Sequence, residues 1–207
     1  MSERGRVAIL ISGRGSNMIS LVDAMRSGAI DADPVVVLSN RPDAAGLERA
    51  QEFGIPTEVV DHSQFKPRRR HDQEVAERLQ AYRPDLVCLA GYMRLLTPVM
   101  VDAFRGRMLN IHPSLLPAFP GLHAQQQALD YGVRVAGCTV HFVDEKCDHG
   151  PIVRQAAVAV EPEDDEASLT ARILEQEHRI YPAAVADFFR GIRIDGRHVR
   201  DLTTASD

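Results

Sequence analysis

Short runs of apolar residues recur along the chain, separated by segments that mix apolar and polar positions. Most of these runs are nearly continuous rather than alternating, which is typical of strands buried on both faces of a parallel sheet. We expect strands at residues 7–11, 35–38, 58–60, 86–90, 108–112, 137–142 and 153–160.

Several of the intervening segments have the spacing of amphipathic helices. In the first, apolar side chains at positions 18, 21, 22 and 25 follow the i, i+3, i+4, i+7 rule. Further helices are expected at 45–53 and at 72–82, the second of which is closed by Pro84. A long amphipathic segment at roughly 167–190 is expected to be interrupted at Tyr181 and Pro182.

Strands that alternate with helices predict an α/β fold. We expect a single Rossmann-like domain over residues 1–207, with a mostly parallel central sheet and helices on both faces. No helix pattern separates the runs at 137–142 and 153–160, so these two are expected to form an antiparallel extension. The polar residues from roughly 191 to 207 are expected to form a partly frayed tail.

Composition narrows the class of protein. The chain has 207 residues and a formal net charge of -5, which argues against nonspecific nucleic-acid binding because that requires a basic surface. Three cysteines without CxxC spacing predict neither a disulfide framework nor a structural zinc site, and a reducing compartment fits them best. No apolar run approaches the roughly 20 residues that span a bilayer, and no signal peptide is visible. We therefore expect a cytoplasmic protein with no membrane partner.

A glycine-containing turn follows the first expected strand, where residues 12–17 read SGRGSN. Glycine lets the backbone approach an anion closely, and the amides of a helix N-terminus bind phosphate. Ser16 and Asn17 can add side-chain donors or cap the helix. A dinucleotide fingerprint would need a third glycine in place of Met18 and an acidic residue after the second strand, where residues 39–41 read SNR. The loop therefore favours a phosphomonoester over NAD, although a plain turn with a helix cap fits it equally well.

Asn110 and His112 lie at the end of the fifth expected strand. Alternate side chains of a strand point to the same face, so the amide and the imidazole are expected side by side. Pro113 stops the strand, which places the pair at the sheet edge where open α/β folds bind ligands. Two such donors suit a carbonyl oxygen that becomes negative during a reaction. A strand end with satisfied polar groups would give the same pattern.

An acidic loop follows the sixth expected strand, where residues 144–151 read DEKCDHGP. A carboxylate in this loop could lie against His112 and favour its charged form. For any one of Asp144, Glu145 or Asp148 alone, a solvated position is the alternative. The neighbouring histidines and cysteine lack a compact ligand spacing such as HExxH, so no metal site is expected.

Six motifs together carry a family resemblance. In chain order they are SGRGSN at 12–17, AGYMRLL at 90–96, LNIHPSLLP at 109–117, FPGLH at 119–123, DHGP at 148–151 and QEHRIYP at 176–182. Over roughly residues 6–190 the chain resembles the folate-dependent formyltransferase family. NIHPSLLP with a downstream DxGP is specific to folate formyl transfer and hydrolysis, and GSN narrows the resemblance to the phosphoribosylglycinamide formyltransferases. The resemblance implies transfer of a formyl group from 10-formyltetrahydrofolate to the amine of 5'-phosphoribosylglycinamide in de novo purine biosynthesis.

The resemblance also implies roles for individual residues. Asn110, His112 and Asp148 would be the catalytic trio, in which Asn110 and charged His112 donate to the oxyanion and Asp148 keeps His112 charged. The substrate phosphate would be held by Gly15, Ser16 and Asn17, and its glycinamide or ribose end by Glu177. The folate would be contacted by Arg68, Met93, Arg94, Leu95, Leu96 and Asn110, without any metal. Two features depart from the usual family pattern: His149 replaces a small residue, and the arginines at 68–70 leave open which of them contacts folate.

Three alternatives stay open. A 10-formyltetrahydrofolate hydrolase shares the trio but is expected to carry a further N-terminal domain, whereas Val7 already begins the first strand here. A methionyl-tRNA formyltransferase is expected to carry a basic C-terminal domain, whereas this chain ends with residues 201–207, DLTTASD. A noncatalytic phosphate- or nucleotide-binding module would use the glycine loop alone and leave the trio unexplained. The sequence also leaves open whether the chain is a monomer or a homodimer.

Overall fold

The structure is a computed structural model, and it describes residues 4–200. Within that range seven strands form one sheet in the order β3-β2-β1-β4-β5-β6-β7. Their bounds are Gly5–Ile11 (β1), Ala32–Ser39 (β2), Thr57–Val59 (β3), Leu86–Leu89 (β4), Met108–His112 (β5), Val135–Phe142 (β6) and Ile152–Ala159 (β7). β1 pairs in parallel with β2 and β4, β2 pairs in parallel with β3, and β6 and β7 are antiparallel. The expected α/β fold with an antiparallel extension is confirmed.

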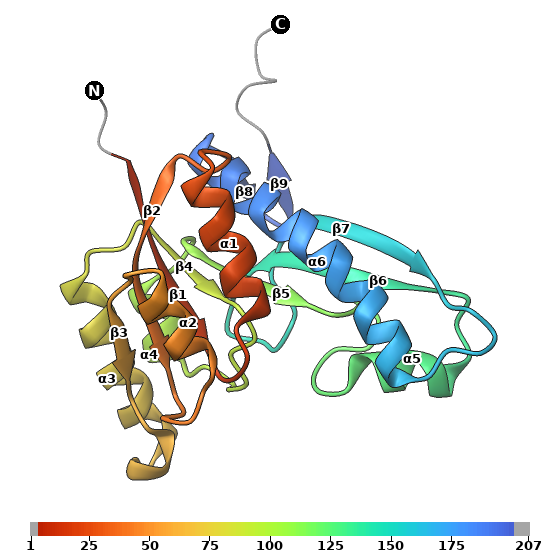
Figure 1. The fold of residues 1–207 in the computed structure, drawn as a ribbon, viewed down its shortest axis with the longest axis horizontal. Coiled ribbons are helices and arrows are strands. Elements are labelled where there is room, and N and C mark those ends of the chain that lie inside the picture. The colour runs from red at the N-terminus through yellow and green to blue at the C-terminus, as the bar shows by residue number, and fades with distance from the viewer. Residues whose placement is uncertain (1–3, 201–207) are drawn as a thin grey trace, which may run out of the picture. The chain divides into compact units, whose positions relative to one another are not determined.

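Along the chain, the helices connect these strands or, for the last helix, follow them (Figure 1). Their bounds are Ser16–Arg26 (α1), Gly46–Glu52 (α2), Arg68–Ala81 (α3), Pro98–Ala103 (α4), Ala124–Tyr131 (α5) and Glu166–Phe189 (α6), with a short 3-10 helix at His62–Gln64. The described residues divide into two compact units, one ending at Leu109 and the other beginning at Asn110. The single domain expected over residues 1–207 stays a prediction.

The first unit is built around β1. Residues 7–11 of this strand are fully buried, because β1 is paired on both edges and covered by helices. α1 packs on β2 and α2, and α3 packs on α4. Parallel strands joined by right-handed crossovers bring their carboxyl ends to one edge of the sheet. The loops after β1 and β4 therefore begin at the same edge of this unit.

In the second unit, the long helix α6 packs on the β6–β7 hairpin. Its start is fixed by a capping box, in which Asp165 accepts a hydrogen bond from the Ser168 amide and Ser168 accepts one from the Asp165 amide. The interruption expected at Tyr181 and Pro182 is wrong, because α6 runs through both residues. Pro182 removes one backbone donor, but the helix buries a continuous stripe that includes Tyr181, and this packing outweighs the lost hydrogen bond.

Other boundaries also differ from the sequence analysis. α3 begins at Arg68 rather than at residue 72, and α4 and α5 were not expected. Part of the expected frayed tail is a hairpin of Arg193–Asp195 (β8) and His198–Arg200 (β9), in which Ile194 pairs with Val199. The rest of that tail, residues 201–207, lies outside the described residues. Short elements with few apolar positions carry too little periodicity to be found from sequence.

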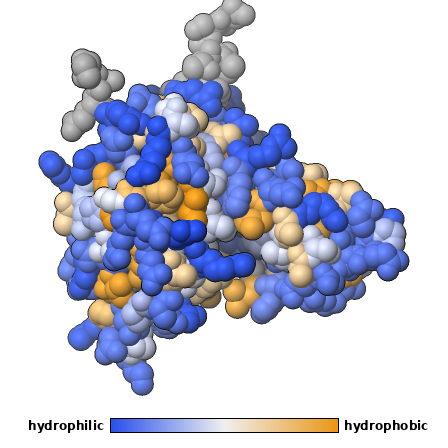
Figure 2. Space-filling model, viewed as in Figure 1, coloured by the Kyte–Doolittle hydropathy of each residue, from blue (hydrophilic) through white to orange (hydrophobic). Residues whose placement is uncertain are grey.

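The surface is mostly polar. Figure 2 shows hydrophilic residues over most of the visible face, with hydrophobic residues in separate patches. The large exposed apolar side chains among the described residues are Val59, Met93, Leu95, Leu122, Tyr131, Val135 and Ile194. In residues 4–200, no helix has the length and apolar character needed to cross a membrane.

Candidate active site

A cluster of four polar side chains occupies the start of the second unit. Asn110 and His112 come from β5, His141 comes from the neighbouring strand β6, and Asp148 comes from the loop after β6. Nδ1 of His112 lies 3.4 Å from Oδ2 of Asp148, and Nε2 of His141 lies 3.8 Å from Oδ1 of the same carboxylate. The amide of Asn110 contacts Nε2 of His141 at 3.2 Å. The structure therefore brings the three residues of the expected trio together.

The contacts of His112 define the form of its ring. Nε2 donates to the carbonyl oxygen of Phe119 at 2.9 Å, while Nδ1 faces the Asp148 carboxylate. Carbonyl and carboxylate oxygens only accept hydrogen bonds, so both ring nitrogens of His112 face acceptors. His112 is 4% exposed, so its ring is held in a buried position next to the carboxylate. An imidazole donor is thus held at the end of β5.

Asp148 is held in an unusual backbone conformation. Its φ of 48° lies in the left-handed region, which costs a residue with a β-carbon about 1–2 kcal/mol. Its Oδ2 accepts hydrogen bonds from the Gly121 amide at 2.8 Å and from the Cys147 thiol at 3.3 Å. Burial and the Asp148 charge raise the pKa of Cys147 to about 11, so this thiol stays protonated and donates.

The end of the same loop is fixed by close packing. The amide of Phe142 donates to the carbonyl of Pro151 at 2.8 Å. A β-carbon at Gly150 would lie 1.8 Å from the Phe142 carbonyl oxygen, so only glycine fits at this position. The two ends of the loop that carries Asp148 are therefore held close together, at Phe142 and at Gly150–Pro151.

His141 belongs to the cluster but was not among the expected site residues. Burial lowers its pKa, so the ring is neutral at pH 7. Nδ1 donates to the Phe142 carbonyl at 2.9 Å, which leaves Nε2 as an acceptor for the Asn110 amide. His141 thereby orients Asn110. The available signal was a histidine within an otherwise apolar strand. Within residues 4–200, no group of three or more such side chains is arranged to hold a metal ion.

The glycine loop lies in the first unit. Gly15, with φ of 76°, is the N-cap of α1, and this helix has no side-chain cap among the described residues. Neither Ser16 nor Asn17 is the N-cap. The amides of a first helical turn have no intrahelical acceptor, which is why helix N-termini bind anions. The Gly46 amide donates to the Gly13 carbonyl at 3.0 Å, and a β-carbon at Gly15 would lie 3.1 Å from the Gly46 Cα.

The segment after β4 is anchored to this loop within the same unit. The Ser12 hydroxyl donates to Oδ1 of Asn40 at 2.5 Å and accepts from the Met93 amide at 2.8 Å. Further along, Oδ2 of buried Asp72 accepts from the Thr97 amide at 2.6 Å. The segment is thus fixed at both ends. Between these anchors the side chains of Met93 and Leu95 are 67% and 56% exposed. This segment therefore exposes apolar side chains of the kind that line ligand sites.

Comparison with known proteins identifies the family. The Formyl transferase family matches residues 5–185. The chain belongs to the formyl transferase family. It is 45% identical over 185 residues to the phosphoribosylglycinamide formyltransferase of Escherichia coli, covering 89% of this chain and 87% of that protein. It is also 53% identical to the trifunctional purine biosynthetic protein adenosine-3 of Drosophila melanogaster, covering 91% of this chain but only 14% of that protein's length.

A solved structure gives the same result for the fold. The glycinamide ribonucleotide transformylase 1 of Symbiobacterium toebii superposes with a TM-score of 0.95 at 53% identity, covering 98% of this chain and 96% of that one. The expected family resemblance is confirmed. The roles of individual residues stay predictions.

The remaining expected binding residues occupy different environments. Arg68, Arg69 and Arg70 are exposed at the start of α3, whose first turn has no acidic residue. Glu177 is buried in α6. Burial raises the pKa of the Cys138 thiol to about 12, and the charge of Glu177 adds to this shift. Cys88 and Cys138 are buried and Cys147 is exposed, and all three thiols are free.

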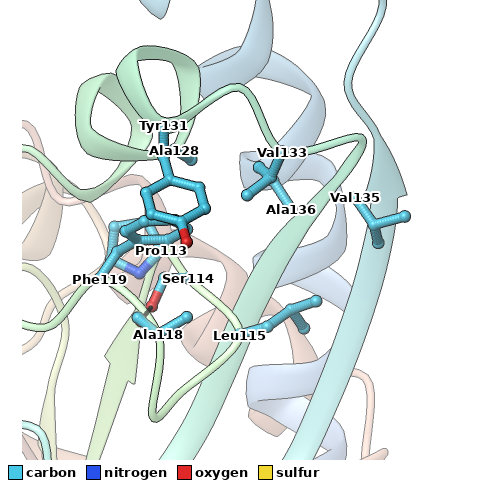
Figure 3. A pocket seen from close by; sticks show the side chains of 10 residues that line it. All are labelled: Pro113, Ser114, Leu115, Ala118, Phe119, Ala128, Tyr131, Val133, Val135 and Ala136. Atoms are coloured by element: carbon cyan, nitrogen blue, oxygen red, sulfur yellow. Dashed lines mark hydrogen bonds between the residues drawn. The ribbon is translucent and has the colours of Figure 1, made fainter.

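An apolar cavity of about 440 Å³ lies in the second unit, next to the cluster of four polar side chains. Figure 3 shows its lining, which comes from the segment after β5, from α5 and from the start of β6. The rings of Phe119 and Tyr131 meet edge to face with centroids 5.8 Å apart. None of the ten lining residues is an expected site residue. The link to the cluster is Phe119, whose carbonyl accepts from His112.

Proposed function

We propose that this chain transfers the formyl group of 10-formyltetrahydrofolate to the amine of 5'-phosphoribosylglycinamide in de novo purine biosynthesis. The observation that carries the proposal is the arrangement of Asn110, His112 and Asp148 in a chain of the formyl transferase family. The named relatives that match almost end to end carry this activity in their names.

The cluster suits acyl transfer to an amine. Attack of the substrate amine on the formyl carbon forms a new C–N bond and places negative charge on the carbonyl oxygen. Asn110 and charged His112 are two donors for that oxygen, and Asp148 stabilises the imidazolium throughout. When the bond to folate N10 breaks, N10 gains a proton and the attacking nitrogen loses one, a transfer that Asp148 can relay through water.

The residues of the first unit supply binding. We infer that Gly15, Ser16 and Asn17 hold the phosphate, because a left-handed glycine leads into the first turn of α1 and the N-terminus of a helix binds anions. Exposed Met93 and Leu95, with their neighbours Arg94 and Leu96, suit the flat apolar ring of the folate.

Charged residues suit the remaining ends of the two substrates. An arginine of the 68–70 run suits the folate carboxylates. Glu177, in the second unit, suits the glycinamide or ribose end of the acceptor. Three free cysteines and the small-molecule substrates favour the reducing cytoplasm as the place of reaction.

A formyl-transfer assay tests the proposal. The purified chain is given 10-formyltetrahydrofolate with and without phosphoribosylglycinamide, and both tetrahydrofolate and free formate are measured. Tetrahydrofolate should form only when the amine substrate is present, with no matching release of formate. Formate release without the amine would identify a hydrolase instead, and binding of the ribonucleotide without turnover would identify a binding module.

A further inference from the structure

The C-terminal hairpin β8–β9 reaches the loop that carries Asp148, and both belong to the second unit. Gly196 and Arg197 form the two-residue turn of the hairpin, where the φ of 60° at Gly196 permits a tight connection. β9 packs against β7, so the turn is supported by the main sheet. Nη1 of Arg197 donates to the backbone carbonyl of His149 at 2.5 Å. The residue contacted is the immediate neighbour of Asp148.

The same guanidinium also contacts the His149 ring. Its Nη1 lies 3.3 Å from Nδ1 and 3.4 Å from Nε2, so it approaches the ring as a whole rather than one nitrogen. The ring also contacts Asp144, with its Nδ1 lying 2.7 Å from Oδ2 of that residue. His149 therefore lies between the hairpin and the first residue of the loop.

Asp144 completes this network. Its Oδ1 accepts from the Lys146 amide at 2.9 Å, which closes the beginning of the loop. Burial alone would raise the pKa of Asp144, but the hydrogen bonds from His149 and Lys146, with a further contribution from the Arg197 charge, lower it. The carboxylate is thus ionised at neutral pH and holds the Lys146 amide and the His149 ring, while Arg197 holds the His149 carbonyl.

This support acts where the backbone is strained. Asp148 has left-handed geometry, and a residue in that region persists only where its surroundings hold it. We propose that Arg197 is a positioning residue, which clamps the His149 backbone so that the Asp148 carboxylate stays against His112. The inference rests on the proposed function for its catalytic consequence, but its structural part stands without it. It also gives a role to His149, the residue that departs from the usual family pattern.

Kinetics of Arg197 variants test the catalytic consequence. Arg197→Ala should lower kcat about 10-fold, since small misplacement of a catalytic group is costly, while KM for both substrates changes less than about 2-fold. Arg197→Lys can still donate to the His149 carbonyl and should recover most of the loss. Arg193→Ala is the matched control, because Arg193 is an exposed arginine on the same hairpin. An Arg197→Ala variant with unchanged kcat, or a control with an equal loss, would overturn the proposal.

A double-mutant cycle tests whether Arg197 acts through Asp148. In an Asp148→Asn background, Arg197→Ala should produce little further loss of kcat, because the carboxylate that it positions has been removed. A full and independent loss in that background would show that Arg197 acts elsewhere.

Amide exchange gives a readout that does not depend on activity. The Gly121 amide donates to Oδ2 of Asp148, so its protection reports where that carboxylate is held. Arg197→Ala should increase Gly121 exchange about 10-fold, and Arg193→Ala should leave it unchanged. Unchanged exchange in Arg197→Ala would refute the clamp. If exchange increases but the parent chain transfers no formyl group, the clamp stands and the proposed function fails.

Discussion

At the scale of single residues, the two histidines of the candidate site have different surroundings. His112 faces two oxygen acceptors, the Phe119 carbonyl and the Asp148 carboxylate. His141 lies beside it and is neutral, because burial lowers its pKa and one of its nitrogens accepts from Asn110. Two histidines near one carboxylate thus have different hydrogen-bond partners.

Removing the Asn110 amide should affect turnover rather than binding. We expect Asn110→Ala to lower kcat about 10²–10³-fold, as for loss of one oxyanion donor, with KM changed only a few-fold. Steady-state kinetics with both substrates measures the effect. Gln126→Ala, which removes an amide from α5 that pairs with Asp130, is the control and should keep parental kcat. An Asn110→Ala enzyme within a few-fold of the parent would exclude this role.

Protonation of His141 should destabilise the fold at mildly acidic pH. Its folded pKa is lowered, whereas the unfolded value is roughly 6.5, so between these two values the unfolded chain binds the additional proton. The free energy of unfolding should therefore fall as pH decreases from about 7 toward 5. His141→Gln keeps an acceptor for Asn110 but does not titrate, so its pH dependence should be flatter.

Urea unfolding at several pH values checks this expectation. Burial also lowers the pKa of His178, so some slope should remain in His141→Gln. Exposed His123 lies outside this cluster, so His123→Gln is the control for a histidine substitution that does not touch Asn110. Identical slopes for the parent and His141→Gln would contradict the assignment.

At the scale of elements, the helix N-termini differ according to their roles. α6 begins with a complete capping box, as a structural helix does. α1 begins at a left-handed glycine without a side-chain cap, an arrangement that suits an anion-binding turn. α3 begins with three exposed arginines at the positive end of its dipole, an arrangement that is unfavourable by about 0.3–1 kcal/mol per charge. The helix dipole does not favour cations at this position, so we expect these arginines to contact the folate.

Alanine substitution along the 68–70 run should separate binding from stability. At least one of Arg68→Ala, Arg69→Ala and Arg70→Ala should raise KM for 10-formyltetrahydrofolate several-fold, and none should lower the free energy of unfolding. Arg78→Ala is the control in the same helix, because Arg78 pairs with Glu58 and Glu74. It should lower stability modestly and leave KM unchanged. If all three variants keep the parental KM, the run does not contact the folate.

At the scale of the whole molecule, the residues proposed for binding and those proposed for chemistry belong largely to different units. The glycine loop, the 91–97 segment and the start of α3 lie before Leu109, whereas Asn110, His112 and Asp148 lie after it. Substitutions in the first unit should therefore act mainly on KM, and those in the trio mainly on kcat.

Gly15→Ala tests this division. A β-carbon there meets left-handed geometry and the Gly46 backbone, which costs about 1–2 kcal/mol and should raise KM for the ribonucleotide about 10-fold, with kcat within a few-fold of the parent. Gly28→Ala is the matched control, since Gly28 has φ of 79° with open space around it. It should lose similar stability without a change in KM.

A competition experiment tests the same loop with the unmodified chain. Inorganic phosphate should displace the ribonucleotide, and NAD should not.

The sequence by itself determined the strands, the fold class and the pairing of Asn110 with His112. Continuous apolar runs give a strong local signal, and an amide and an imidazole two residues apart on a strand must share a face. The glycine turn before α1 was equally local. These features depend on neighbours in the chain, so periodicity and motif spacing were sufficient to find them.

Only the tertiary structure decided how these residues are held. His141 orients Asn110 across 31 positions of the chain, and Arg197 reaches His149 across 48. The uninterrupted course of α6 through Pro182 likewise depends on packing against β6 and β7. Such contacts join elements that are distant in sequence, and a charge state or a hydrogen-bond partner follows from three-dimensional burial, which no local pattern records.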